Sequence, residues 1–255
     1  MNRRTLFVAS WKANKRKKDV IEWMEEVQGP AAAFLHEVAL CPSYPHLDLV
    51  LERLPSTIKM GAQDCSRHGM GPYTGEITAS MLTDYKVEYC IVGHVERRMM
   101  GETDEIINQK IKQCLANGIT PVICLGETLA EYDNNQTRVV IERQMRDGLV
   151  GIKDYDKLVL CYMPIWSIGT GFYTSGEYAN LISDFMRKTM QSISGVPMVG
   201  NIPVLYGGGV TQSNAKEYLE QPDIDGLVFA VSALKVKDFS EMINTKFTQK
   251  SFAGE

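Results

Sequence analysis

The segment DEIINQKIKQCLANGITPVICLGE, residues 104–127, contains one complete structural repeat of the chain. Its first part, 104–117, has apolar side chains at steps of three and four residues, which is the period of an amphipathic helix. Thr103 is positioned to cap this helix, and Gly118 follows its C-terminal end. The run 120–127 is apolar at nearly every residue, which predicts a strand buried on both faces.

The same alternation recurs along the whole chain. A second helical segment, 177–194, is predicted to end at Gly195 and Pro197 and to place four apolar residues on one face: Leu181, Ile182, Phe185 and Met186. Apolar runs that predict strands occur at 5–10, 37–42, 57–63, 88–94, 120–127, 157–164, 202–209 and 225–231.

Eight strand–helix repeats in about 250 residues are typical of an α/β protein with the (β/α)8 barrel fold. An open, doubly wound sheet is the alternative. No linker-like or low-complexity stretch divides the chain. We therefore expect a single TIM-barrel domain over residues 1–255, with a polar C-terminal tail at about 248–255.

Composition and charge exclude several other classes of protein. Hydrophobic residues make up 44% of the 255 residues and charged residues 23%, which is typical of a globular protein. The formal net charge of −4 offers no basic excess for a nucleic acid. No run approaches the about 18 apolar residues of a membrane span. The apolar stretch near the N-terminus has only about five residues, fewer than the about 7–15 of a signal peptide. We expect a cytoplasmic protein that binds neither nucleic acid nor membrane.

Six cysteines are spread through the sequence, and no two of them form a CxxC pair. Several lie inside the apolar runs, so we interpret them as reduced, buried thiols. We expect no metal and no organic cofactor.

Catalytic side chains of such barrels lie on loops that follow the C-terminal ends of the strands. Lys12 follows the first predicted strand, and His94 ends the fourth. Each also has a simpler interpretation, as a solvated lysine and as a histidine packed at a strand end. The glycine-rich loops 164–171 and 206–210 follow the sixth and seventh strands. Their backbone N–H groups favour a phosphate site over simple turns.

Seven blocks of the sequence, in their order and spacing, resemble the triosephosphate isomerase family over residues 5–248. The blocks are SWKAN (10–14), GPYTGEIT (71–78), GHVERRMMGETDE (93–105), ITPVICLGETL (119–129), YMPIWSIGTG (162–171), YGGGV (206–210) and DIDGLVFAVSAL (223–234).

The resemblance implies a homodimeric isomerase of carbohydrate metabolism that acts in glycolysis on a small sugar phosphate. Its members interconvert an aldose and a ketose through an enediolate. The substrate is glyceraldehyde 3-phosphate and dihydroxyacetone phosphate, or a tetrulose phosphate in a side branch that Ser232-Ala233 resembles. In the family, a glutamate on the loop after the sixth strand moves the proton, a neutral histidine polarises the carbonyl, and a lysine supplies positive charge.

The matching positions give the expected site. Lys12 and His94 match the lysine and histidine, Glu96 matches a buried acid beside them, and Gly207 and Gly208 match a phosphate cradle. The residues expected to bind substrate or phosphate are Ser10, Lys12, Gly169, Gly209, Ala230 and Val231. The expected lid consists of Pro164, Ile165, Trp166, Ser167, Ile168, Gly169, Thr170 and Gly171. Thr74 and Glu76 are expected to anchor a loop that inserts into the neighbouring subunit of a homodimer.

The decisive departure from the family pattern is Met163, which stands where the family has the catalytic glutamate. A thioether cannot take up a proton, and the loss of a general base typically costs about 10²–10⁴ in rate. Val95 replaces the serine that hydrogen-bonds this glutamate in the family, so both polar partners have become apolar together. Cys161 and Glu96 are weak substitutes for the base.

Other departures surround the expected phosphate and lysine sites. Ser10 and Asp64 replace asparagines, and we expect Asp64 to pair with Lys12. Gly209 replaces a serine, and Ala230-Val231 replaces a Gly-Gly pair, which narrows the approach to the backbone. We predict an isomerase of strongly impaired standard activity. The alternatives are a non-catalytic barrel that binds a phosphorylated metabolite and an enzyme repurposed to a different reaction on a phosphorylated substrate.

Overall fold

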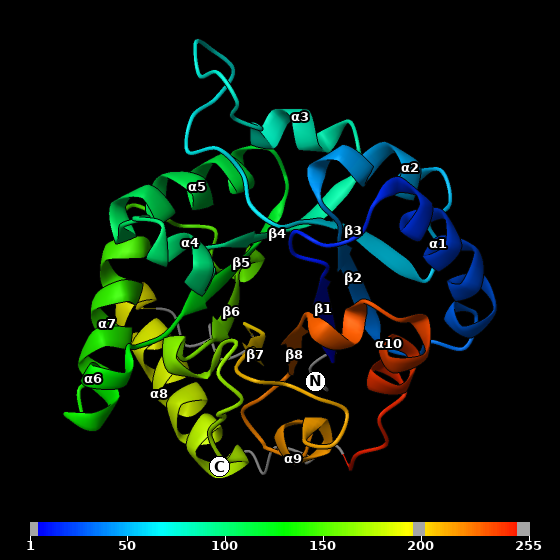
Figure 1. Cartoon of the computed structure of the whole chain (residues 1–255). Coiled ribbons are helices and arrows are strands. Elements are labelled where there is room, and N and C mark those ends of the chain that lie inside the picture. The colour runs from blue at the N-terminus through cyan, green and yellow to red at the C-terminus, as the bar shows by residue number, and fades with distance from the viewer. Residues whose placement is uncertain (1–4, 196–201, 249–255) are drawn as a thin grey trace.

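The computed structural model describes residues 5–195 and 202–248, in which eight parallel strands close into a barrel in sequence order (Figure 1). The strands are β1 (Leu6–Ser10), β2 (Glu37–Cys41), β3 (Ile58–Ala62), β4 (Val87–Val92), β5 (Thr120–Leu125), β6 (Val159–Tyr162), β7 (Val204–Tyr206) and β8 (Gly226–Phe229). β1 also pairs with β8. This closure confirms the (β/α)8 barrel and excludes the open sheet.

Helices surround the barrel on its outside (Figure 1). They are α1 (Lys17–Ala31), α2 (Leu47–Leu51), α3 (Ala79–Thr83), α4 (Val95–Met99), α5 (Asp104–Ala116), α6 (Leu129–Asp133), α7 (Thr137–Gly148), α8 (Gly176–Ser194), α9 (Ala215–Leu219) and α10 (Val236–Ile243). Short 3₁₀ helices also occur, namely η1 (Tyr44–His46), η2 (Tyr155–Lys157), η3 (Ile165–Ser167) and η5 (Val231–Ala233). None of the helices in the described ranges is both long and apolar enough to cross a membrane.

The repeat around α5 follows the sequence prediction closely. The Thr103 hydroxyl accepts a hydrogen bond from the Ile106 N–H, and Gly118 ends the helix with a φ of 71°. A left-handed backbone of this kind costs glycine less than any other residue. The following strand ends at Leu125, earlier than expected, because the chain turns there toward the barrel mouth.

The prediction for α8 is wrong at one position. Ile182 and Met186 are buried, but Leu181 is 44% exposed. The buried face of α8 runs through Ala179, Ile182, Met186 and Met190, at steps of three and four residues, and Leu181 lies beside it. Gly195 ends the helix with a φ of 66°. Pro197 and residues 249–255 of the expected tail lie outside the described residues.

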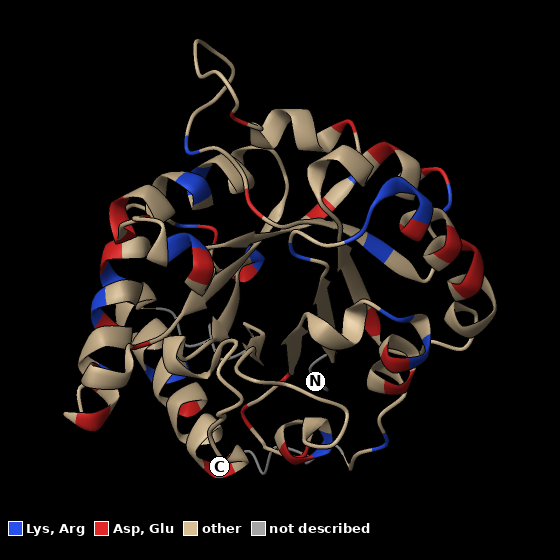
Figure 2. Ribbon diagram, in the orientation of Figure 1, with Lys and Arg blue, Asp and Glu red and all other residues tan. Residues whose placement is uncertain are grey.

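Strand side chains alternate between two apolar cores. From β1, Leu6 and Val8 point into the barrel, whereas Phe7 and Ala9 face the helices. Both signs of charge are distributed over the outer helices (Figure 2). All six cysteines are free thiols and buried, as the sequence predicted. The barrel core fixes where each strand ends, and therefore where the loops above it begin.

Candidate active site

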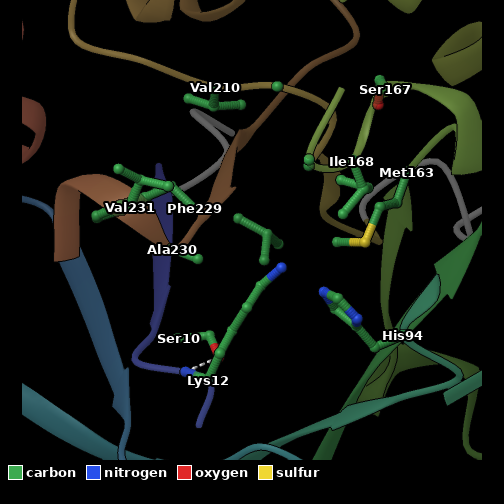
Figure 3. Close-up of a pocket in the computed structure, with 14 residues that line it drawn as sticks. Ser10, Lys12, His94, Met163, Ser167, Ile168, Val210, Phe229, Ala230 and Val231 are labelled. Carbon is green, nitrogen blue, oxygen red and sulfur yellow. Dashed lines mark hydrogen bonds between the residues drawn. The ribbon is translucent and has the colours of Figure 1, made fainter. Parts of the chain in front are cut away.

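A pocket opens at the C-terminal ends of the strands (Figure 3). It is lined by Ser10, Lys12, His94, Met163, Ser167, Ile168, Gly169, Gly207, Gly209, Val210, Val228, Phe229, Ala230 and Val231. These residues come from the C-terminal ends of β1 and β8 and from the loops that follow β1, β4, β6, β7 and β8, so segments far apart in the sequence meet here. None of them is an aspartate or a glutamate.

Lys12 directs its side chain into this pocket (Figure 3). Its backbone has a φ of 50°, in the left-handed region, which costs a non-glycine residue on the order of 1 kcal/mol. The Lys12 N–H donates to the hydroxyl of Ser10 at 3.2 Å, which helps to hold this turn. The ammonium group donates to a Glu96 carboxylate oxygen, with 2.5 Å between Nζ and Oε1. Lys12 is the cation of the pocket.

His94 caps the N-terminal end of α4, where its Nδ1 accepts the Glu96 N–H at 3.2 Å. Burial, together with the charge of Lys12, lowers the pKa of His94 to about 4, although Glu96 opposes the shift. The imidazole is therefore neutral at pH 7. Because Nδ1 accepts a hydrogen bond, the ring proton lies on Nε2, which makes that nitrogen a donor.

Two expectations about carboxylates are wrong. Glu96 was expected to be buried, but its side chain is 49% exposed, because it lies on the outer rim of the barrel mouth at the start of α4. Asp64 was expected to pair with Lys12. It instead accepts hydrogen bonds from the Lys110 ammonium at 2.6 and 2.7 Å, because α5 brings Lys110 under the loop that follows β3. The partner of Lys12 is thus Glu96.

Met163 follows β6 and is 2% exposed. Its N–H donates to the Leu125 carbonyl at 2.7 Å, which ties the end of β6 to β5. A Cβ on Gly207 would lie 2.6 Å from the Met163 terminal methyl group, so the absence of a side chain there provides room for the thioether. Val95 belongs to the same buried apolar cluster as Met163.

The expected lid begins at Pro164 and leads through η3. In η3, the indole N–H of Trp166 donates to Glu127, with 2.8 Å between Nε1 and Oε1. The Tyr162 hydroxyl donates to the same oxygen at 3.0 Å. Burial raises the pKa of Glu127. The apolar run 120–127 predicts a strand that includes Glu127. Its position just beyond the C-terminal end of β5 is the signal that marks it as a residue of the barrel mouth.

The tip of the lid is the exposed Gly169-Thr170-Gly171 segment, whose two glycines have φ of 74° and 81°. Ser167, Ile168 and Gly169 line the pocket. The Thr170 hydroxyl donates to the Trp166 carbonyl at 2.8 Å, and this bond holds the tip against the start of the loop. The inner side of the lid therefore faces the pocket.

The glycine-rich loop after β7 contributes Gly207 and Gly209 to the pocket, but not Gly208. A Cβ on Gly208 would lie 2.6 Å from the Ser167 hydroxyl, so this glycine faces the lid. Opposite them, Ala230 and Val231 begin η5. Val231 is 80% exposed. Within the described residues, the N–H groups of Gly169, Gly209 and Val231 have no hydrogen-bond partner.

Thr74 and Glu76 lie far from the pocket, on the loop between β3 and α3. This loop projects away from the barrel in Figure 1, and both residues are exposed. Tyr73 stacks on His68 within the loop, with ring centroids 3.9 Å apart.

The sequence is similar to those of known proteins along nearly its whole length. The profile of the family described as triosephosphate isomerase matches residues 5–246. The triosephosphate isomerase of Alkaliphilus oremlandii is 37% identical over 246 residues, which are 95% of this chain and 99% of the relative. That of Chlorobium luteolum is 38% identical over 248 residues, which are 94% and 98%. The chain belongs to the triosephosphate isomerase family.

The resemblance found in the sequence is thereby confirmed for the family and the fold. In this member of the triosephosphate isomerase family, Lys12 supplies a positive charge to the pocket, and His94 supplies a neutral hydrogen-bond donor. Gly169, Gly209 and Val231, whose N–H groups have no partner among the described residues, line the same pocket. A carboxylate to receive a proton from carbon is missing from the pocket lining.

Proposed function

We propose that the pocket binds a small phosphorylated sugar and catalyses its aldose–ketose isomerisation only weakly, because Met163 occupies the position of the general base. The observation that carries this proposal is a pocket whose lining has a cation, a neutral imidazole and glycine-rich loops but no carboxylate. The substrate class is that of the family: a three-carbon or four-carbon ketose or aldose phosphate.

Binding is supported by the groups that remain. A phosphate is held by backbone N–H groups and by positive charge. Gly169, Gly209 and Val231 offer the amides, and Lys12 offers the charge. In the absence of substrate, Glu96 neutralises Lys12 at 2.5 Å. The tip of the lid has glycines at 169 and 171, in backbone conformations that other residues rarely adopt.

Weak catalysis is supported by the lack of a substitute base. Cys161 is fully buried below Met163, and burial raises the pKa of its thiol, so a thiolate is not available there. Glu96 is engaged by Lys12 and does not line the pocket. Without a base, the rate should fall by about 10²–10⁴.

A second candidate function is a barrel that binds a phosphorylated metabolite without turning it over. Val231 favours it, because an exposed valine side chain covers the approach to the amides at the start of η5. The two candidates differ in proton exchange and not in binding.

Both candidates are tested by one incubation with dihydroxyacetone phosphate, and then with a tetrulose phosphate, in D₂O. Line broadening of the substrate signals reports binding, and deuterium entering the carbon next to the carbonyl reports a base. We expect broadening with slow exchange in the wild type, and neither in Lys12→Met. Exchange at the rate of an ordinary family member would overturn the proposal. Broadening with no exchange at all selects the second candidate.

We also propose that the chain forms a homodimer through the loop that bears Thr74 and Glu76. The loop is exposed at its tip and projects from the barrel, which suits insertion into another subunit. Sedimentation velocity of the wild type and of a Thr74→Arg variant tests this. A dimer that Thr74→Arg weakens is expected, whereas a wild-type monomer contradicts the proposal.

A further inference from the structure

A group of three cysteines lies between the barrel and its outer helices, away from the pocket. Cys65 is on the loop after β3, Cys90 faces outward from β4, and Cys114 is on the inner face of α5. All three are buried, and their sulfurs lie within 4.8 Å of one another. The sulfurs of Cys65 and Cys114 are 3.5 Å apart. Figure 1 shows β4 and α5 as neighbours.

We propose that Cys65, Cys90 and Cys114 form a three-sulfur binding site for a soft monovalent cation, copper(I). Soft thiolate ligands select copper(I) and zinc among the common metal ions. A metal–sulfur bond of about 2.3 Å in a trigonal arrangement separates the sulfurs by about 4 Å. The three sulfurs of this group reach that spacing with small side-chain movements.

The number of ligands distinguishes copper(I) from zinc. Structural zinc almost always has four ligands. In the described part of the chain, no histidine, aspartate or glutamate joins the three cysteines. The nearest further contact is the Lys110 carbonyl, 3.9 Å from the Cys65 sulfur. Three sulfurs without a fourth strong donor suit a three-coordinate cation better than a tetrahedral one.

The charges beside the cluster come from Lys110 and from the two carboxylates that pair with it. Each cysteine that binds as a thiolate gives its proton to solvent, which leaves negative charge around the metal ion. Lys110, on the same helix as Cys114, carries a buried ammonium group beside the cluster. Asp64 and Glu102 already pair with this ammonium group, so the proposed site rests on its sulfur ligands and not on the charge of Lys110.

The other three cysteines provide an internal comparison. Cys41, Cys124 and Cys161 lie in the barrel interior. Over residues 5–195 and 202–248, the Cys65 group is the one set of three or more potential ligand side chains whose donor atoms converge. A copper site that depends on the converging sulfurs of the Cys65 group should therefore tolerate the loss of Cys41.

The test is anaerobic titration of the full chain with copper(I) in competition with a coloured copper(I) chelator. Because the site is buried, copper(I) is supplied both to the native protein and during refolding. We expect the wild type to withdraw one copper(I) per chain from the chelator, Cys114→Ser to withdraw at least tenfold less, and Cys41→Ser to behave like the wild type. Equal retention by Cys114→Ser and the wild type, or no retention by either, would overturn the proposal.

A second measurement removes the dependence on folded variants. X-ray absorption of the copper-loaded wild type should give three sulfur neighbours at about 2.3 Å. A shell with nitrogen or oxygen ligands, or fewer than three sulfurs, contradicts the site. In the same titration zinc should bind more weakly than copper(I), and a preference for zinc would also overturn the assignment.

Discussion

The terminal methyl group of Met163 occupies the space above Gly207, where a Cβ would lie only 2.6 Å away. The sulfur of Cys161 is the next neighbour of that same Cβ position, at 3.0 Å. The residue that replaces the family's base is thus packed into the barrel core rather than held in water. The local structure has accommodated a thioether at this position.

Gly207→Ala should therefore destabilise the protein. The added methyl group would overlap the Met163 side chain, and overpacking of a core typically costs about 1–3 kcal/mol. Urea unfolding at pH 7 measures this cost. In the Met163→Ala background the extra methyl group should cost less, because the overlap is removed. An equal cost in both backgrounds would show that the contact with Met163 is not the cause.

His94 should make the stability depend on pH. Its folded-state pKa of about 4 lies below the ordinary value of 6.5, so below pH 6.5 the unfolded state binds the proton first. Stability is lost as the pH falls from 6.5 to 4, by about 2 kcal/mol at pH 5.

A His94→Asn variant isolates this effect. Between pH 7 and pH 5 the wild type should lose about 2 kcal/mol more of its free energy of unfolding than the variant. Because other groups, Asp64 among them, titrate in both proteins, their contributions cancel in the difference. Equal losses would mean that His94 is protonated in the folded protein at pH 5.

Lys110→Met should be strongly destabilising. The Lys110 ammonium bonds Asp64 at 2.6 Å and Glu102 at 2.5 Å, and all three groups are shielded from solvent. Removing one partner from such a buried network typically costs about 3–5 kcal/mol. Lys188 is the matched control, because its pair with Asp184 is exposed, and Lys188→Met should cost under about 1 kcal/mol. Thermal and urea unfolding of both variants give the comparison.

Much of the fold was predictable from the sequence because its signals are local. The helix at 104–117 carries its own cap and its own terminating glycine, and buried strands of parallel sheets are continuously apolar. The error at Leu181 has a different origin, since three- and four-residue steps leave more than one choice of buried face. Strand ends were placed one to three residues late where the apolar run continues into the loop.

The candidate site was predictable only in part. Lys12 and His94 reach the pocket because each lies two residues beyond the C-terminal end of a strand. The partner of Asp64 was mispredicted, because Lys110 belongs to a helix that tertiary packing brings next to the loop of Asp64. The convergence of Cys65, Cys90 and Cys114 was missed for the same reason: no short motif links them.

We attribute the weak isomerisation proposed for this protein to Met163. The direct measurement is the rate at which deuterium from D₂O enters dihydroxyacetone phosphate, compared for the wild type, Met163→Glu and the matched control Met163→Gln. We expect the exchange rate of Met163→Glu to exceed that of the wild type by about 10²–10⁴, whereas Met163→Gln, similar in size but unable to accept the proton, should show no gain. Fast exchange in the wild type with no gain in Met163→Glu would contradict this role of Met163.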